Sequence, residues 1–262
     1  MGARDQRSVK TKTLLEYLNQ RLNVESFIDS SYNGLQVEGS SEVHRVVTGV
    51  SSSDRLFASA IKRNADAIIV HHGLFWRGDR SPLVVGILKE RLKRLLIKDV
   101  NLLAYHLPLD AHPEIGNNVL IAQALGLKEI KFFPVAGSSN PPLMAIGLLD
   151  HHVSFEGFCR YADEVLKTSG ISLRLAKFEV LKVAIVSGGG SAHWEEAARE
   201  GADLLVTGDI KENVVRAAEE VGINLYAAGH YNTEKWGVRA LCGEITREFG
   251  IPAEFIDIPN PI

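Results

Sequence analysis

Two adjacent histidines, His71 and His72, end an apolar run rich in β-branched residues and are followed by Gly73. The run, residues 67–70, is typical of a fully buried strand. Successive side chains on a regular strand point to opposite faces, so both histidines could not bind one ion there. Each could instead hold one of two nearby metal ions where the strand opens into a loop. The alternative is a pair of ordinary loop histidines.

A second histidine and a carboxylate follow the next predicted strand, residues 102–105. If this strand is a parallel neighbour of residues 67–70, His106 and Asp110 reach the same sheet edge, where α/β proteins bind ligands. Asp110 is the better ligand candidate, because it offers a hard oxygen donor beside two imidazoles. His106 could be a ligand, a residue that supports a ligand, or a catalytic general base.

The second half of the chain repeats the pattern of the first. Residues 46–73 and 183–210 align without a gap as strand, small-residue turn, helix and apolar strand. This pattern predicts βαβ units, an α/β fold and an internal duplication. We expect two related, interleaved α/β halves, with the metal site in the cleft between them. The first half is residues 1–128, with about 238–262 packing back onto it, and the second is residues 129–237.

The spacing of His106 and Asp110 recurs as His230 and Glu234 after the matching strand. Two halves that face each other would bring both strand ends to one cleft. The predicted ligands are then three histidines and two carboxylates: His71, His72, Asp110, His230 and Glu234. Structural zinc sites are usually closed and rich in sulfur, whereas this set suits a two-metal centre with open positions for water.

Composition narrows the classes of protein to consider. The 262 residues carry a net charge of −3, which makes nucleic acid an unlikely partner. Cys159 and Cys242 are far apart in sequence, which argues against a disulfide framework and fits a reducing compartment. No apolar run approaches the roughly 18 residues of a membrane span, and residues 1–7 lack a signal-peptide core. We therefore expect a cytoplasmic protein without membrane contact.

Several local patterns give further expectations. Thr11 or Thr13 should cap a helix that runs to Leu22, and one residue of 51–54 should cap the next. Residues 155–166 predict another helix. Asn33-Gly34 indicates a hairpin turn, and Gly188-Gly-Gly190 a tight turn or, alternatively, an anion site at a helix start. Two other histidine sites are expected to be exposed: His151-His152, after an apparent edge strand, and His112, before Pro113.

Together these motifs resemble the Nif-three-like dinuclear metal-centre family, also called GTP cyclohydrolase I type 2 homologues. The resemblance covers nearly the whole chain and rests on five segments: residues 33–37, 65–73, 106–110, 207–209 and 229–234. It implies the same five ligands, with Glu234 touching both ions. It also implies a ring-shaped, toroidal homohexamer whose metal sites face an interior cavity. Larger relatives carry an inserted domain, for which residues 128–180 are too few.

The expected function is that of a metal-dependent hydrolase acting on a nucleotide-like small molecule. Two divalent cations per chain can bridge a water and yield a hydroxide nucleophile, and the family label suggests ring opening of GTP. His106 could move the proton. Trp76 could stack on a base or simply pack in the core, and Arg77 could pair with a phosphate.

The donor set leaves the metal open among zinc, iron, manganese and nickel. The alternative function is a non-catalytic protein that stores, delivers or senses metal, or a ring scaffold for protein partners.

Overall fold

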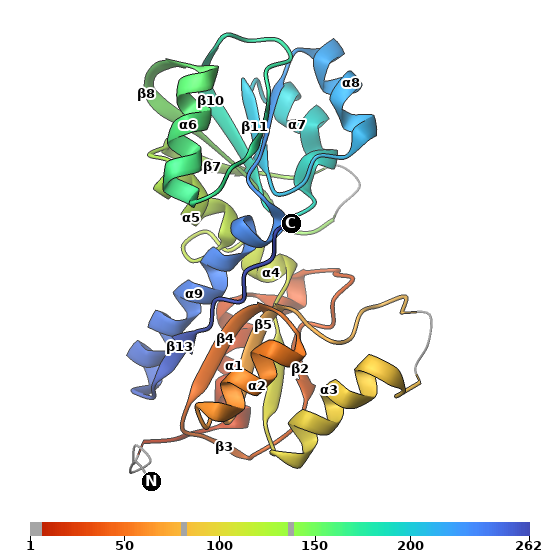
Figure 1. Cartoon of the computed structure of the whole chain (residues 1–262). Helices are drawn as coiled ribbons and strands as arrows, with labels where there is room; N and C mark the ends of the chain where they lie inside the picture. The colour runs from red at the N-terminus through yellow and green to blue at the C-terminus, as the bar shows by residue number, and fades with distance from the viewer. Residues whose placement is uncertain (1–6, 80–82, 136–138) are drawn as a thin grey trace. The chain divides into compact units, whose positions relative to one another are not determined.

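The computed structural model describes residues 7–79, 83–135 and 139–262 (Figure 1). Nearly all of the N-terminal stretch judged to lack a signal-peptide core, residues 1–6, lies outside these ranges. The contacts within the chain divide it into two compact units. Unit 1 comprises Met1–Leu109 and Gly237–Ile258, and unit 2 comprises Asp110–Trp236 and Pro259–Ile262. Residues 110–128, which the sequence analysis assigned to the first half, belong to unit 2 in this division.

Unit 1 is built on a five-stranded sheet of order β13-β4-β5-β6-β2. The strands are β13 (Ala253–Phe255), β4 (Val46–Ser51), β5 (Ala67–His72), β6 (Asn101–Ala104) and β2 (Gly34–Val37). The first four are parallel to one another, whereas β2 runs antiparallel to β6. A short ladder of β1 (Val9–Lys10) and β3 (Glu42–Val43) lies outside this sheet. The parallel pairing predicted from the βαβ pattern is confirmed.

The first helix of unit 1 ends within one residue of the predicted Leu22. The helices of this unit are α1 (Thr11–Arg21), α2 (Asp54–Lys62), α3 (Gly86–Ile97), α4 (Leu107–Asp110) and the 3₁₀ turn η1 (Val24–Ser26). Ser53 caps α2 by accepting a hydrogen bond from the backbone N–H of Leu56 at 3.2 Å, as predicted for this segment. The expectation that Thr11 or Thr13 caps α1 was wrong. The Thr11 hydroxyl donates instead to the carbonyl of Ser40 at 2.6 Å, because the β1–β3 ladder brings that carbonyl close.

Asn33-Gly34 does not form the hairpin that its sequence suggested. The strand that follows it, β2, pairs with β6, which is remote in sequence. The Asn33 amide donates to Asp29 Oδ2 at 3.0 Å and accepts the backbone N–H of His106 at 2.8 Å. Gly34 has a φ of +97°, which a side chain would strain. The turn residues therefore bind a distant loop rather than close a local hairpin.

Unit 2 contains a six-stranded sheet of order β7-β8-β10-β11-β12-β9. The strands are β7 (Lys128–Phe133), β8 (Met144–Ser154), β10 (Glu179–Val186), β11 (Leu204–Thr207), β12 (Asn224–Ala227) and β9 (Ile171–Leu173). Strands β10, β11 and β12 are parallel, and the other three pair antiparallel to their neighbours.

Helices flank the unit 2 sheet on both sides (Figure 1), and a hydrophobic cluster fills the space on each face. Helices α5 (Asn117–Ala124) and α6 (Phe155–Leu166) supply one cluster, and α7 (Trp194–Arg199) and α8 (Glu212–Val221) supply the other. The bounds of α6 match the predicted helix. The 3₁₀ turn η2 (Gly190–His193) precedes α7, and α9 (His230–Phe249) begins in unit 2 and ends in unit 1.

The two sheets share the same arrangement of four adjacent strands. Each has three parallel strands in sequence order, followed by an antiparallel edge strand: β4-β5-β6-β2 in unit 1 and β10-β11-β12-β9 in unit 2. The predicted mixed α/β class is confirmed, and the internal duplication stays a prediction. Among the described residues, no helix combines the length and apolarity needed to span a membrane.

Two expectations about other histidines had different outcomes. His151 and His152 are exposed, as predicted. They lie within β8, however, which has β7 on one side and β10 on the other, so β8 is not an edge strand. His112 is buried, contrary to expectation, because its Nδ1 accepts the backbone N–H groups of Glu114 and Ile115 at 3.1 and 3.2 Å.

Within unit 1, a buried ion pair joins α1 to α9. Arg21 donates two hydrogen bonds of 3.0 Å to the two carboxylate oxygens of Glu244, and Arg247 donates a third. Burial tends to raise the pKa of Glu244, but the bonds and charges of Arg21 and Arg247 outweigh it, and the pKa falls below its usual value.

We predict that Glu244→Gln lowers the free energy of unfolding by about 1.5–3 kcal/mol at pH 7, because a buried charged hydrogen-bond network is lost. A carboxylate whose native pKa is depressed stabilises the fold above its unfolded pKa. That stability disappears as the pH falls through the native pKa. Urea unfolding should therefore show the difference between wild type and variant shrinking from pH 7 toward pH 3. The exposed Glu248→Gln on the same helix is the control, and an equal effect of both variants would contradict the prediction.

Candidate functional site

Three histidines gather at the carboxyl edge of the unit 1 sheet. His71 and His72 are the last residues of β5, and His106 comes two residues after the end of β6, its parallel neighbour. Their ligand atoms all lie within 4.8 Å of one another. His71 is fully buried and the other two are half-buried. The sequence expectation that these two strand ends meet at one edge is confirmed.

The rings of His71 and His72 lie on the same side rather than on opposite faces, with centroids 4.8 Å apart. Both residues belong to β5, and His72 still pairs with Ser51 of β4, so the two rings approach each other at the last two positions of the strand. The His106 centroid is 4.9 Å from that of His71 and 5.7 Å from that of His72. The three imidazoles therefore form one compact group.

Each histidine of this group has a protein partner on its Nδ1 atom. The partners are the Tyr105 carbonyl for His71 at 2.9 Å, the Ser51 hydroxyl for His72 at 3.2 Å, and Asp29 Oδ1 for His106 at 2.8 Å. A partner on one ring nitrogen fixes the orientation of the ring and directs metal binding to the other nitrogen. The geometry therefore assigns Nε2 as the ligand atom of each residue.

Asp29, which the sequence analysis treated only as a turn residue, holds His106 in place. Besides the imidazole, its carboxylate accepts the backbone N–H groups of Ser31 and Leu107 at 3.0 and 2.9 Å. Burial tends to raise the pKa of Asp29, but the bonds and charge of His106 and the bond from Asn33 hold it well below its usual range. An ionised carboxylate is thus buried behind His106. The sequence feature that could have revealed this role is the spacing of Asp29 and Asn33, four residues apart. The Asn33 amide donates to Asp29 Oδ2.

Gln36 braces the loop that follows the two histidines. Its Oε1 accepts the backbone N–H groups of Leu74 and Phe75 at 2.7 and 3.2 Å, and its Nε2 donates to the Phe75 carbonyl. A Cβ atom at Gly73 would collide with the Gln36 amide. Glycine is therefore needed at residue 73, because only glycine lets the loop backbone approach Gln36 this closely.

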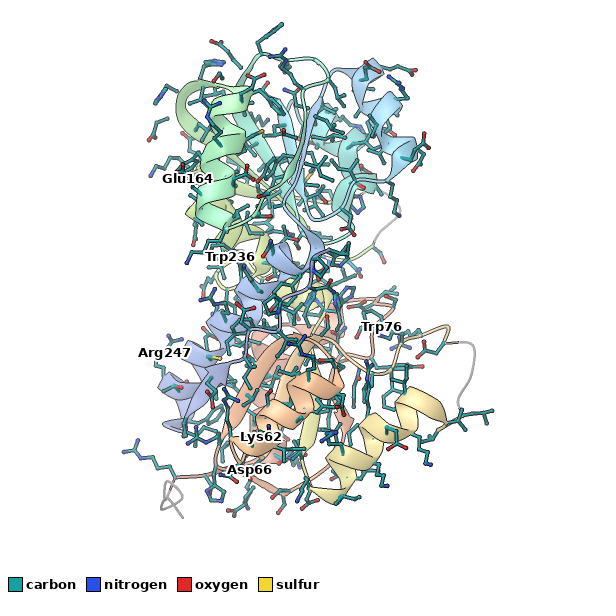
Figure 2. All side chains as sticks on the ribbon, in the orientation of Figure 1. Lys62, Asp66, Trp76, Glu164, Trp236 and Arg247 are labelled. Carbon is teal, nitrogen blue, oxygen red and sulfur yellow. The ribbon has the colours of Figure 1, made fainter. Side chains whose placement is uncertain are left out.

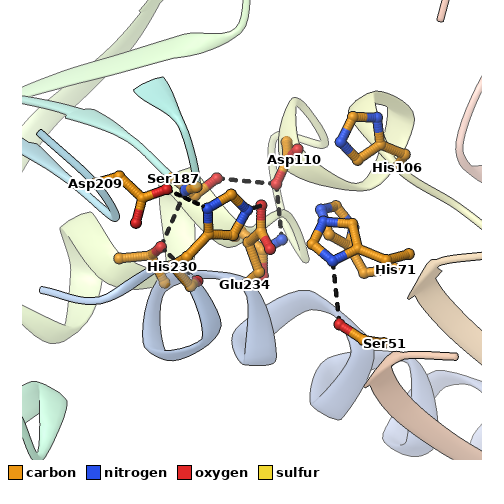
Figure 3. A network of polar contacts seen from close by, with 12 residues as sticks. Ser51, His71, His106, Asp110, Ser187, Asp209, His230 and Glu234 are labelled. Carbon is orange, nitrogen blue, oxygen red and sulfur yellow. Dashed lines mark hydrogen bonds and ion pairs between the residues drawn. The ribbon is translucent and has the colours of Figure 1, made fainter. Parts of the chain in front are cut away.

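Unit 2 presents a second group, centred on His230 and Glu234 in the first turns of α9. The two residues share one face of the helix, and His230 Nε2 lies 3.1 Å from Glu234 Oε1. Asp209, in the loop after β11, bonds to His230 Nδ1 at 2.6 Å (Figure 3). As in unit 1, a protein partner on Nδ1 directs metal binding to Nε2. Asp209 belonged to a family-like motif in the sequence, but its role as a partner of His230 was not foreseen.

The two carboxylates around His230 stabilise its protonated, positively charged form. The hydrogen bond with Glu234 raises its pKa most; burial lowers it, but the charges of Glu234 and Asp209 and the bond to Asp209 raise it further, to about 9. At neutral pH a proton therefore occupies the position between His230 and Glu234 that a metal ion could take. Metal binding at Nε2 would release that proton.

Asp110 is buried in unit 2 and is held by neutral donors. Its Oδ1 accepts hydrogen bonds from the Asn117 side chain at 2.7 Å and the Ser187 hydroxyl at 2.9 Å (Figure 3). Asn118, the next residue, accepts the backbone N–H of Ser187 at 2.8 Å. These bonds fix the orientation of the carboxylate, as the bonds around a metal ligand do.

The glycine run 188–190 forms a tight turn, as expected, and this turn packs directly on the second group. The Gly188 carbonyl accepts the backbone N–H groups of Gly208 and Asp209 at 2.9 and 3.0 Å. Gly188 has a φ of +58°, and a Cβ there would collide with the Glu234 carboxylate and lie 3.1 Å from His230 Nε2. Glycine is therefore needed at this position for both backbone and steric reasons.

The donors of both groups fit a divalent metal ion. Imidazole nitrogens and carboxylate oxygens are the ligands that zinc, iron, manganese and nickel accept. Within unit 1 the structure brings together His71, His72 and His106, so His106 joins the metal-capable group as well as being a candidate base. Within unit 2 it brings together His230 and Glu234, and Asp110 bonds to Asn117 and Ser187.

Comparison with known proteins points to one family. A family model described as Duf34/NIF3 (NGG1p interacting factor 3) matches residues 9–261. A protein of Escherichia coli (strain K12) named GTP cyclohydrolase 1 type 2 homolog is 40% identical over 254 residues, covering 97% of this chain and 100% of the relative. A Yersinia pestis protein of the same name is 40% identical over 263 residues, covering 97% and 99%.

Solved structures agree with these relatives. A protein described as ybgI, of unknown function, superposes with a TM-score of 0.90 at 39% identity, covering 97% of this chain and 100% of that one. The protein TTHA1606 from Thermus thermophilus gives 0.87 at 34% identity, with the same coverage. The likeness extends over both units.

We predict that Gly188→Ala weakens metal binding by roughly tenfold or more, because the new Cβ displaces the Glu234 carboxylate. Isothermal titration calorimetry with Zn²⁺ or Mn²⁺ measures the affinity for metal, and far-ultraviolet circular dichroism checks that each variant is folded. Gly189→Ala is a matched control, since a Cβ at Gly189 meets no atom within 4 Å. Equal affinities of the two variants would show that Glu234 does not need the space at residue 188.

Proposed function

Because the chain belongs to the Duf34/NIF3 family, we propose that it binds two divalent metal ions and uses them to hydrolyse a nucleotide-like substrate. The proposed ligands are the five predicted residues: His71, His72, Asp110, His230 and Glu234. One observation carries the proposal: every histidine in the two groups has its Nδ1 atom held by the protein, which leaves Nε2 as the metal-binding atom.

The proposed ligand set comprises His71 and His72 of unit 1 and three residues of unit 2: Asp110, His230 and Glu234. His106 and Asp110 are four residues apart, and α9 carries His230 and Glu234 in its first turns. Two bound divalent ions would lower the pKa of a water molecule and polarise a phosphoryl or carbonyl oxygen, as hydrolysis at neutral pH requires. The names of the relatives suggest GTP as the first substrate to test.

His106 is the proposed general base. Asp29 accepts the Nδ1–H of His106, so the lone pair of the imidazole is on Nε2, where it can take a proton. Because Asp29 is buried and ionised, it also stabilises the imidazolium that forms when the proton arrives. The same residue could then return the proton to the leaving group. A role of His106 as a third imidazole ligand is the alternative that the experiment must separate from this one.

We predict about two metal ions per chain in protein purified without chelator or affinity metal, as measured by elemental analysis. Glu234→Ala should lose most of this metal, because it removes a proposed ligand. His106→Asn should keep the metal but lower the rate of hydrolytic ring opening of GTP by about 10²- to 10⁴-fold, the usual contribution of a general base. His152→Asn, at an exposed position in β8, is the control for both measurements.

Each outcome of this experiment separates the alternatives. An absence of metal, before and after reconstitution, would overturn the proposed centre. Two metals without turnover of GTP or other nucleotides would favour a protein that stores or delivers metal, or a ring scaffold. Loss of metal in His106→Asn would make His106 a ligand.

We also propose, from the family resemblance, that the protein is a toroidal homohexamer in the cytoplasm. Light scattering of the purified protein should then give six times the 28.7 kDa of one chain. A monomer or dimer at micromolar concentration would contradict this assembly.

A further inference from the structure

The indole of Trp76 lies beside the histidine group of unit 1. Its ring centroid is 5.1 Å from that of His106, in an edge-to-face arrangement at 78°, and 5.8 Å from that of His72. Trp76 is half-buried, in the loop that follows β5 (Figure 2). An aromatic surface thus adjoins the proposed base and a proposed metal ligand.

The backbone fixes the place of this indole. Trp76 forms an isolated antiparallel bridge with Ser31, and the next backbone N–H, of Arg77, donates to the Ser30 carbonyl at 2.6 Å. The Trp76 backbone N–H itself donates to Asp79 Oδ2 at 3.0 Å. These bonds hold the loop that carries the ring, so less conformational entropy of the loop is lost when a ligand binds.

Trp76 contacts the histidine rings and lies outside the hydrophobic cluster that its neighbours join. Leu74 and Phe75 pack against the hydrophobic cluster of unit 1, whereas Trp76 is not among the residues packed there in the described chain. The indole N–H of Trp236 donates to the Asn232 carbonyl at 3.0 Å. In the part of the chain that the structure describes, the indole N–H of Trp76 donates to no protein acceptor. Trp76 therefore retains both an aromatic surface and a hydrogen-bond donor for a ligand.

We propose that Trp76 is the platform on which the flat ring of the substrate stacks, so that the substrate carries a nucleobase. This inference rests on the proposed function and specifies its substrate class. Any nucleobase can stack on an aromatic side chain, because every base has a π-face. A ring on this platform would lie near the imidazoles of His72 and His106.

Arg77 is not part of the platform. Its guanidinium carbon lies 4.8 Å from the centroid of the Tyr32 ring, a cation–π contact that joins the loop after β5 to the segment before β2. The prediction that Arg77 pairs with a phosphate stays a prediction, and the platform does not depend on it. The ring, rather than the phosphates, is what the platform recognises.

Equilibrium dialysis of the metal-loaded protein with GTP tests the platform, and tripolyphosphate is the probe that lacks the ring. We expect Trp76→Ala to weaken GTP binding by about 5- to 100-fold, with tripolyphosphate binding and metal content unchanged. Trp76→Phe should restore most of the affinity, because it keeps an aromatic ring. Trp194→Phe, in unit 2, is the control. The recovered nucleotide is analysed, so that binding and hydrolysis are scored separately.

Ring-dependent binding that Trp76→Ala abolishes would support the platform even without turnover, and only the hydrolase proposal would then fail. Unchanged GTP affinity in Trp76→Ala would overturn the platform. So would wild-type protein that binds GTP no more tightly than tripolyphosphate. Loss of metal in Trp76→Ala would also overturn it, because the indole would then serve to support the histidines.

Discussion

The hydrogen bonds on the Nδ1 atoms of the histidines are the interactions on which the candidate site depends. A buried polar group without a partner costs several kcal/mol, and His71 is fully buried. Its partner, the Tyr105 carbonyl, follows β6, so this bond exists only because β5 and β6 pair in parallel register. The Ser51 hydroxyl that holds His72 ends β4, the other neighbour of β5. The sheet thus positions the donors and orients each ring.

Carboxylates behind the imidazoles give the two units related but different electrostatics. In unit 1, Asp29 lies behind His106 and stays ionised despite its burial. In unit 2, His230 lies between Asp209 and Glu234, and its pKa rises to about 9. The first arrangement holds the His106 ring by a buried carboxylate on Nδ1. The second places His230 between two carboxylates, which favour its protonated form at neutral pH.

Glycine provides the space that these polar contacts need. At Gly73 the loop backbone approaches the Gln36 amide, and at Gly188 it approaches the Glu234 carboxylate. A methyl group at either position would move a side chain on which a candidate ligand depends. The motif residues around the histidines are therefore explained by packing and hydrogen bonding of the loops as much as by metal binding.

The sequence by itself determined the strand that carries His71 and the strand that precedes His106. It also determined the bounds of α6, the α/β class and the types of donor at the strand ends. Period and composition are local properties, and they report burial directly. Only the tertiary structure decided that Asn33 bonds to His106, that His112 is buried, and that Asp29 and Asp209 lie behind imidazoles. A sequence pattern shows which groups need partners, but remote strands and loops supply those partners, and their pairing follows from the packing of the whole unit.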